Sequence, residues 1–160
     1  MPKRWIATAG VVVALISSNV SAHTCKTTDA DTTAVTDALR TLYAGATVDD
    51  MAKMHSVTAP TFYAFDGGHR YGGIDELMKV VRALQDQGVK YIWKVTQPKV
   101  TIHCSEAWIS YVNDGSVQMP NSASPHPVQW LESAVLEKQH GAWKIVFFHS
   151  TLVPEATPAK

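Results

Sequence analysis

The strongest constraint on the fold is a pair of long apolar segments near the C-terminus, residues 128–137 and 143–152, on either side of His140-Gly141. Both segments are rich in β-branched and aromatic side chains, which favour β-strands. A polar residue followed by glycine between two such segments predicts a β-hairpin with a two-residue turn. The chain therefore contains at least one antiparallel sheet built on two long strands.

The predicted turn also determines which residues pair across this hairpin. Glu132 lies opposite His149, and both share a face with Trp130 because side chains alternate along a strand. The remaining residues of this face are apolar: Ala134, Leu136, Trp143, Ile145 and Phe147. An acid beside an imidazole on an apolar face is typical of acid–base chemistry, so Glu132 and His149 are the candidate catalytic residues. The alternative is a polar pair that only fixes the register.

The opposite face of the same hairpin is also largely apolar. It carries Leu131, Ser133, Val135, Val146 and Phe148. A sheet that is apolar on both sides has to be covered on both sides. We therefore expect helices over one face and a second copy of the chain over the other, as in a homodimer.

The helices are expected before this hairpin. Apolar residues recur at helical spacing from Asp31 to Ala44, where Gly45 ends the first predicted helix, and two further helices are predicted over residues 48–56 and 74–87. Shorter apolar segments predict strands at 61–65, 69–71, 91–103 and 107–112. Three N-terminal helices followed by long strands predict an α+β fold, with a curved antiparallel sheet covered on one face.

Four aromatic residues are candidates for the wall of a pocket on the inner face of this sheet. Tyr63, Trp93 and Tyr111 lie in predicted strands, and Trp130 shares the face of Glu132. These four are therefore the candidate ligand-binding residues. For Tyr111 the alternative is a core tyrosine whose hydroxyl finds a backbone partner.

Three stretches of the C-terminal hairpin are similar to a known family: Glu132-Ser133-Ala134-Val135-Leu136, His140-Gly141-Ala142-Trp143, and Lys144-Ile145-Val146-Phe147-Phe148-His149-Ser150. They resemble the C-terminal signature of the SnoaL-like branch of the nuclear-transport-factor-2-like superfamily, which has a cystatin-like fold. Relatives in this superfamily include ketosteroid isomerase and the association domain of calcium/calmodulin-dependent protein kinase II. The resemblance covers residues 35–153.

The resemblance implies a cone, in which three N-terminal helices pack on the concave face of the sheet around a central pocket. Such pockets serve isomerases, dehydratases, cyclases and non-enzymatic binders, so the fold does not decide the function. Ketosteroid isomerase combines an acidic base with a tyrosine and a protonated aspartate as oxyanion donors. Tyr63, Asp66, Tyr111 and Glu132 are expected near the pocket, but none matches that enzyme's motif position by position.

Two classes of function fit these residues. In the first, the domain is an acid–base enzyme without a cofactor, and Glu132 or His149 acts as general base on a small apolar or amphipathic molecule. In the second, the same pocket binds a ligand without turnover, and the domain serves binding or oligomerisation.

The first 22 residues have the anatomy of a secretory signal peptide. Lys3 and Arg4 precede an apolar segment of residues 5–16, and Val20-Ser21-Ala22 fits a cleavage site. The apolar segment is shorter than the roughly 20 residues that a membrane span needs. The predicted organisation is a signal peptide (1–22), an N-terminal segment (23–34), the domain (35–153) and a tail (154–160). We expect a periplasmic or secreted protein without a membrane span after cleavage.

Charge and cysteine content agree with export. The sequence has 14 basic and 14 acidic side chains, and loss of Lys3 and Arg4 leaves a small acidic excess, which does not favour nucleic acid as a partner. In an oxidising compartment, Cys25 and Cys104 predict a disulfide that closes a loop of about 80 residues. The alternative is a frayed N-terminus with Cys104 packed at the end of a strand.

A metal site is a third, weaker possibility. Cleavage after Ala22 would make His23 the N-terminal residue, whose amine and imidazole could together chelate copper. No pair of histidines has the spacing of a common metal motif, so no metal ligand is predicted within the domain.

Overall fold

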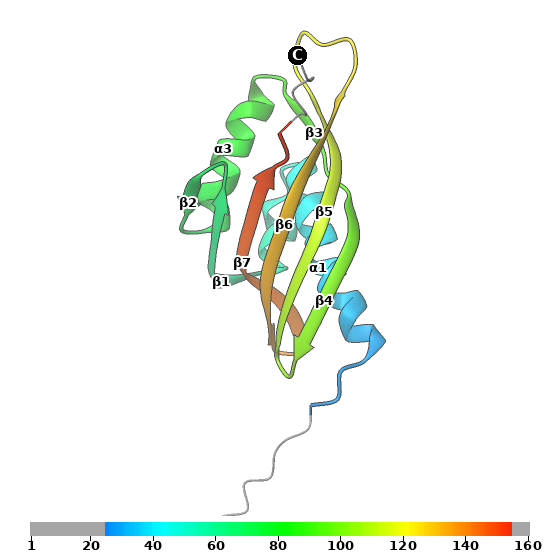
Figure 1. Ribbon diagram of the computed structural model, residues 1–160. Helices are drawn as coiled ribbons and strands as arrows, with labels where there is room; N and C mark the ends of the chain where they lie inside the picture. Colours follow the sequence, from blue (N-terminus) through cyan, green and yellow to red (C-terminus); the bar gives the residue numbers. More distant parts are fainter. Residues whose placement is uncertain (1–24, 155–160) are drawn as a thin grey trace, which may run out of the picture.

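The computed structural model describes residues 25–154, so the predicted signal peptide, His23 and residues 155–160 lie outside the described residues. Three helices and seven strands follow one another along this part of the chain (Figure 1). Their bounds are α1 Asp29–Thr47, α2 Met51–His55, β1 Thr58–Asp66, β2 His69–Tyr71, α3 Ile74–Asp86, β3 Lys90–Ile92, β4 Val95–His103, β5 Glu106–Gln118, β6 His126–Gln139 and β7 Ala142–Leu152.

The strands form one curved sheet in the order β2-β1-β7-β6-β5-β3, and β4 pairs with β5 as β3 does, along a different part of that strand. The predicted α+β fold is confirmed, since the helices pack on one face of this sheet and leave the other face uncovered (Figure 1). The pairing of β1 with β7 is parallel, whereas the other pairings are antiparallel. The sheet is therefore mixed, because β1 joins it at β7, far away in the sequence.

The hydrophobic core lies between α1 and the concave face of the sheet. Side chains of α1 at helical spacing meet those of β5, β6 and β7, and all of them are almost completely buried. The central members are Val35, Leu39, Leu42, Ile109, Leu136 and Ile145. A cavity remains between this contact and α3.

The first helix is longer than the sequence predicts. Gly45 does not end α1, which continues to Thr47. A Cβ atom at Gly45 would lie 2.7 Å from Cγ of Met54, so this glycine allows α2 to pack closely against α1. The cap of α2 is also later than predicted, since the side chain of Asp50 accepts a hydrogen bond from the backbone N–H of Lys53.

The register of the C-terminal hairpin corrects the predicted pairing of Glu132 with His149. Next to the turn the prediction holds, because Lys138 pairs with Trp143. A β-bulge then adds one residue to β7 after Ile145, so that Glu132 pairs with Ser150 instead. A shift of one residue exchanges the two faces of a strand.

The bulge moves the aromatic and polar residues of β7 to opposite faces from those predicted. Phe148 and Ser150 are buried on the concave face, where Phe147 and His149 had been expected. His149 lies on the convex face, and its Nε2 atom is 3.4 Å from the hydroxyl of Thr151. His149 and Glu132 therefore do not form the predicted catalytic pair.

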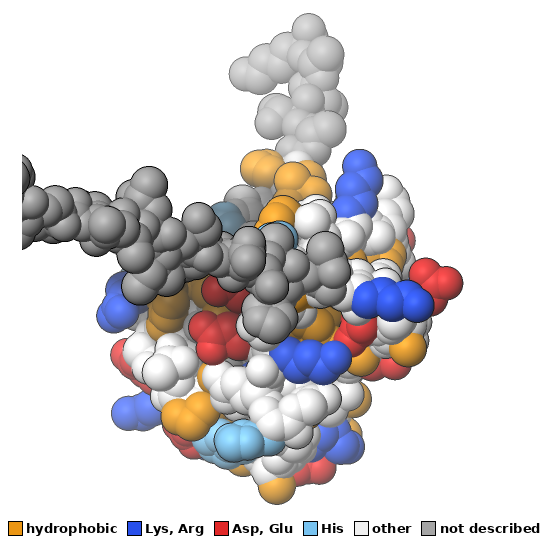
Figure 2. Space-filling view, turned by 90° about the horizontal axis from the view of Figure 1, so that it is seen from below, with side chains coloured by type: hydrophobic (Ala, Val, Ile, Leu, Met, Phe, Trp, Pro, Cys, Tyr) orange, Lys and Arg blue, Asp and Glu red, His pale blue; other side chains and the backbone are white. Residues whose placement is uncertain are grey.

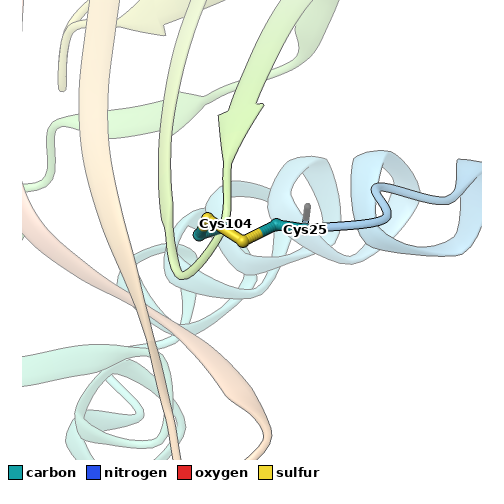
Figure 3. The surroundings of a disulfide bond; sticks show 2 residues. All are labelled: Cys25 and Cys104. Carbon is teal, nitrogen blue, oxygen red and sulfur yellow. A yellow bond between two sulfur atoms is a disulfide. The ribbon is translucent and has the colours of Figure 1, made fainter. Parts of the chain in front are cut away.

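A disulfide joins Cys25 to Cys104, as predicted (Figure 3). It connects the segment before α1 to the tight turn between β4 and β5. Nearby, the ammonium of Lys138 lies 2.6 Å from the carboxylate of Asp31 in α1, so a second contact holds the same end of the helix to the sheet. The start of α1 is thus attached at two points.

The face of the molecule seen in Figure 2 carries charges of both signs. In the view from below, basic and acidic side chains are interspersed over the visible face (Figure 2). Within residues 25–154, no helix is both long and apolar enough to cross a membrane.

We predict that replacing Cys25 and Cys104 together by serine lowers the free energy of unfolding by about 4 kcal/mol, because the reduced unfolded chain gains the entropy of an open loop. Urea denaturation of the oxidised protein and the double variant measures this difference. Wild-type protein under reducing conditions should match the variant. Equal stability of the oxidised and serine forms would show that the bridge does not restrain the unfolded chain.

Candidate functional site

A cavity of about 200 Å³ lies between α1, α3 and the concave face of the sheet. Its wall is mostly apolar and aromatic, with two carboxyl groups. The lining residues are Leu42, Tyr43, Ala46, Met54, Asp66, Ile74, Leu77, Met78, Val80, Val81, Leu84, Tyr91, Trp93, Trp130, Glu132, Phe148 and Ser150. A concave apolar site with a few convergent polar groups is the usual form of a small-molecule site.

Glu132 is the centre of a buried hydrogen-bond network. Its side chain is only 6% exposed and accepts hydrogen bonds from the hydroxyl of Tyr43, from Nδ2 of Asn113 at 3.2 Å and from the hydroxyl of Ser150 at 3.0 Å. The hydroxyl of Tyr111 lies 3.1 Å from that of Tyr43. Residues from α1, β5 and β7 therefore converge on one carboxyl group of β6.

Sheet pairing arranges the polar residues of the site in a row across the concave face. Tyr111 pairs with Glu132, Glu132 pairs with Ser150, and Ser150 pairs with Asp66 at the end of β1. The side chain of Ser150 lies between the two carboxyl groups, bonding Glu132 and also lowering the pKa of Asp66. The row spans four adjacent strands and ends at the cavity.

Burial raises the pKa of both carboxyl groups above their ordinary values. For Glu132, removal from water raises the pKa, and the hydrogen bonds from Tyr43, Ser150, Tyr111 and Asn113 partly oppose this effect. For Asp66, burial again raises the pKa, and Ser150 lowers it. Carboxyl groups with raised pKa values in a cavity are candidates for proton transfer near neutral pH.

A stack of three aromatic rings forms one wall of the cavity. Trp93 stacks on Tyr43 with ring centroids 5.6 Å apart, and on Tyr91 with centroids 5.1 Å apart. The close approach of β3 to β5 supports this wall, because a Cβ atom at Gly115 would lie 2.1 Å from the backbone oxygen of Ile92. Only glycine allows this contact, so Gly115 helps to place Trp93 against α1.

The structure brings some of the predicted site residues together. Glu132, Trp93 and Trp130 line the cavity, and Tyr111 lies directly behind it in the network of Glu132. Tyr63 does not line the cavity, because alternation along β1 places Phe62 and Ala64 inside and Tyr63 outside. Its ring contacts Phe147 on the convex face, with centroids 4.9 Å apart.

Three residues of the site were not among the predicted site residues, and Asp66 was expected near the pocket without a role. Tyr43 continues the buried stripe of α1, one turn after Leu39, and its position alone could have indicated a polar tip in the cavity. Asn113 follows Tyr111 at a spacing of two in a strand, which signals a polar residue on an inner face. Ser150 could not be predicted from the sequence, because it faces the cavity only as a result of the β-bulge in β7.

Residues 25–154 contain no cluster of three or more histidine, cysteine, aspartate or glutamate side chains that could hold a metal ion. The proposed copper ligand His23 lies outside the described residues.

The comparison with family models agrees with the geometry. The model of the SnoaL-like domain matches residues 35–154. The chain belongs to the SnoaL-like domain family. No curated protein sequence matches this SnoaL-like chain. The predicted resemblance is thereby confirmed, and the matched residues include α1 from Val35 onward, the cavity and the whole sheet.

Solved structures show the same fold at low sequence identity. The hub homology domain of calcium/calmodulin-dependent protein kinase II from Chlamydomonas reinhardtii is 22% identical, with a TM-score of 0.66 over 78% of this chain and 99% of that one. A ketosteroid isomerase-like protein from Erwinia carotovora atroseptica is 14% identical, with a TM-score of 0.64 over 79% and 99%. A structure assigned as a dehydratase of the nuclear-transport-factor-2-like family, from Streptomyces avermitilis, is 14% identical, with a TM-score of 0.66 over 80% and 99%.

We predict that Tyr43→Phe raises the pKa of Glu132 further, because the hydroxyl of Tyr43 is a hydrogen-bond donor that lowers this pKa. Carbon-13 NMR of the side-chain carboxyl during a pH titration measures the shift. Tyr91→Phe is the control, since Tyr91 stacks on Trp93 without being a donor to Glu132. An unchanged titration in Tyr43→Phe would contradict the assigned contact.

The same variant has an expected effect on stability. A carboxyl group whose pKa is raised by folding stabilises the protein below its ordinary pKa of 4.5, and this stabilisation is lost as the pH rises through the raised value. Tyr43→Phe should therefore lose more stability at about pH 8 than at about pH 4, with a loss of about 1–3 kcal/mol at the higher pH.

Proposed function

We propose that this SnoaL-like protein binds a small molecule in the inner cavity and moves a proton on it, as isomerases and dehydratases do. The observation that carries this proposal is the pair of carboxyl groups of Asp66 and Glu132 in one largely apolar cavity, each with a pKa raised by burial. The alternative function, ligand binding without turnover, uses the same cavity. The experiments below distinguish it from catalysis.

Asp66 is the better candidate for the group that contacts the substrate. Glu132 already accepts hydrogen bonds from Tyr43, Asn113 and Ser150, whereas Asp66 is half-buried at the end of β1. In the proposed step, the carboxylate of Asp66 takes a proton from a carbon next to a carbonyl group. Returning that proton to a different carbon completes an isomerisation and consumes no other reactant.

Ser150 and Glu132 would support Asp66 by positioning and by charge. The hydroxyl of Ser150 donates a hydrogen bond to Glu132, and the Ser150 side chain also lowers the pKa of Asp66. Glu132 is therefore a positioning residue in this proposal, and the earlier expectation that Glu132 itself is the base becomes the second candidate. His149 lies on the convex face and is not a base in this proposal, although its charge lowers the pKa of Asp66.

The size of the cavity favours a small substrate. At about 200 Å³ it is below the range of about 300–1,000 Å³ that is common for drug-sized ligands. A single ring fits this space better than a polycyclic skeleton such as a steroid.

We predict that the protein catalyses exchange of deuterium for the hydrogens next to the carbonyl of 4,4-dimethylcyclohexanone in heavy water, which proton NMR follows directly. Asp66→Asn should reduce the exchange rate by a factor of about 10²–10⁴, the usual contribution of a general base. Glu132→Gln should reduce it less and shift its pH profile. Asp114→Asn, on the exposed side of β5, is the matched control.

Binding measurements separate the two functions. Ketone binding without exchange in the wild-type protein would leave the binding module as the function. Exchange that survives in Asp66→Asn but is lost in Glu132→Gln would assign the base to Glu132.

We further propose that the convex face of the sheet forms a homodimer. Large apolar side chains are exposed there, with Leu131 56%, Trp108 53% and Phe65 42% exposed. Exposed apolar patches of this kind mark protein interfaces. The hub homology domain of the kinase shares the fold, and its name describes an assembly domain.

We predict that Leu131→Arg converts the dimer to a monomer, because a buried unpaired guanidinium on the interface is strongly unfavourable. Light scattering after gel filtration measures the mass. Val48→Arg is the control, since Val48 is 67% exposed at the end of α1, away from the convex face. A monomeric wild-type protein would overturn the proposal.

Export is also a proposal. The disulfide between Cys25 and Cys104 supports it, because such bonds persist in oxidising compartments. Together with the predicted signal peptide, it points to the periplasm or the exterior. Mass determination of the mature protein tests cleavage after Ala22.

A further inference from the structure

We propose that the inner cavity selects small organic cations, such as quaternary or protonated amines, over neutral molecules of the same shape. This inference rests on the proposed function, since it names the class of substrate or ligand for the same cavity.

The charged groups of the wall are all acidic. Asp66 and Glu132 line the cavity, and none of the lining residues is a lysine, arginine or histidine. The larger groove that adjoins it at Tyr91, about 560 Å³, is different, since Arg82 and Lys90 lie there among Asp49 and Asp86. The inner cavity therefore offers a cation acidic groups with no basic residue among its lining residues.

Three hydrogen-bond donors around Glu132 are already used within the protein. The hydroxyl of Tyr43, the amide of Asn113 and the hydroxyl of Ser150 all donate to Glu132. The donors of Tyr43, Asn113 and Ser150 are therefore occupied, and the two carboxyl groups of the cavity offer acceptors to a ligand. This arrangement differs from an oxyanion hole, in which a tyrosine and a protonated acid donate to the substrate.

Aromatic rings supply the second kind of contact that an organic cation prefers. Tyr91, Trp93, Trp130 and Phe148 line the same cavity as Asp66. A cation within about 6 Å of an aromatic centroid gains attraction from the ring face, and more when water is excluded. The stacking of Tyr91 on Trp93, with an angle of 6° between the rings, holds part of this wall in place.

A bound cation would also relieve an unfavourable feature of the empty cavity. Burial makes ionisation of Asp66 and of Glu132 costly. A positive charge placed near Asp66 offsets this cost. A neutral ligand of the same shape offers no such compensation.

An isosteric pair of probes tests this selectivity. The 1,1-dimethyl-4-oxopiperidinium ion and 4,4-dimethylcyclohexanone differ by one positively charged nitrogen in place of a carbon. Calorimetric titration of the wild-type protein should give a dissociation constant about tenfold lower for the cation. Equal binding, or tighter binding of the neutral ketone, overturns the inference and leaves the proposed function intact.

Variants then locate the selectivity. Asp66→Asn should abolish the preference for the cation and leave binding of the neutral ketone nearly unchanged, which also shows that the variant cavity is folded. Asp114→Asn, the matched control on the exposed side of β5, should keep the preference. A preference that survives in Asp66→Asn, or one that is lost equally in both variants, overturns the assignment to the cavity.

The remaining outcome concerns both proposals. If neither probe binds, the cavity is not a site for molecules of this size, and the proposed function falls together with the inference. Binding of the cation with no deuterium exchange overturns only the catalytic part of the proposed function.

Discussion

The buried carboxyl group of Glu132 is the interaction on which the arrangement of the domain depends. Its partners come from α1, β5 and β7, so the helix layer and three strands meet at one polar point inside an apolar core. A buried carboxylate without partners costs several kcal/mol, so the helix and strands cannot move apart freely. This network therefore fixes α1 against the sheet, and with it the shape of the cavity.

A buried acid such as Glu132, whose hydrogen bonds are all made within the protein, can be purely structural. The feature that favours a function is the second acid of the cavity, Asp66. Asp66 faces the same cavity, shares Ser150 with Glu132 and has fewer partners of its own. A second buried acid with few hydrogen-bond partners does not stabilise a network that is only structural. Glu132 has its hydrogen bonds filled within the protein, whereas Asp66 can still bind a ligand. Such a difference between two acids is typical of proton-transfer sites, where the two acids have separate roles.

The comparison of sequence and structure shows where local patterns carry information. Helical spacing and long apolar strands predicted the elements and the α+β fold, and alternation placed Glu132 and Trp130 on the inner face. The bulge in β7 was invisible because Phe147 and Phe148 are both aromatic, so either register buries an apolar ring. Tyr63 was misplaced for the same reason, since Phe62 beside it fits the core equally well.

The two apolar faces of the sheet connect assembly with the site. Asp66 ends β1, and its neighbour Phe65 points to the convex face, where its ring contacts Phe147 with centroids 5.6 Å apart. A partner subunit on that face would cover these rings and restrain the edge of the sheet that carries Asp66. In the proposed dimer, this restraint would add to the pairing of Asp66 with His69 and Ser150 in the sheet. Assembly would thus set the geometry of the site from the opposite face of one strand.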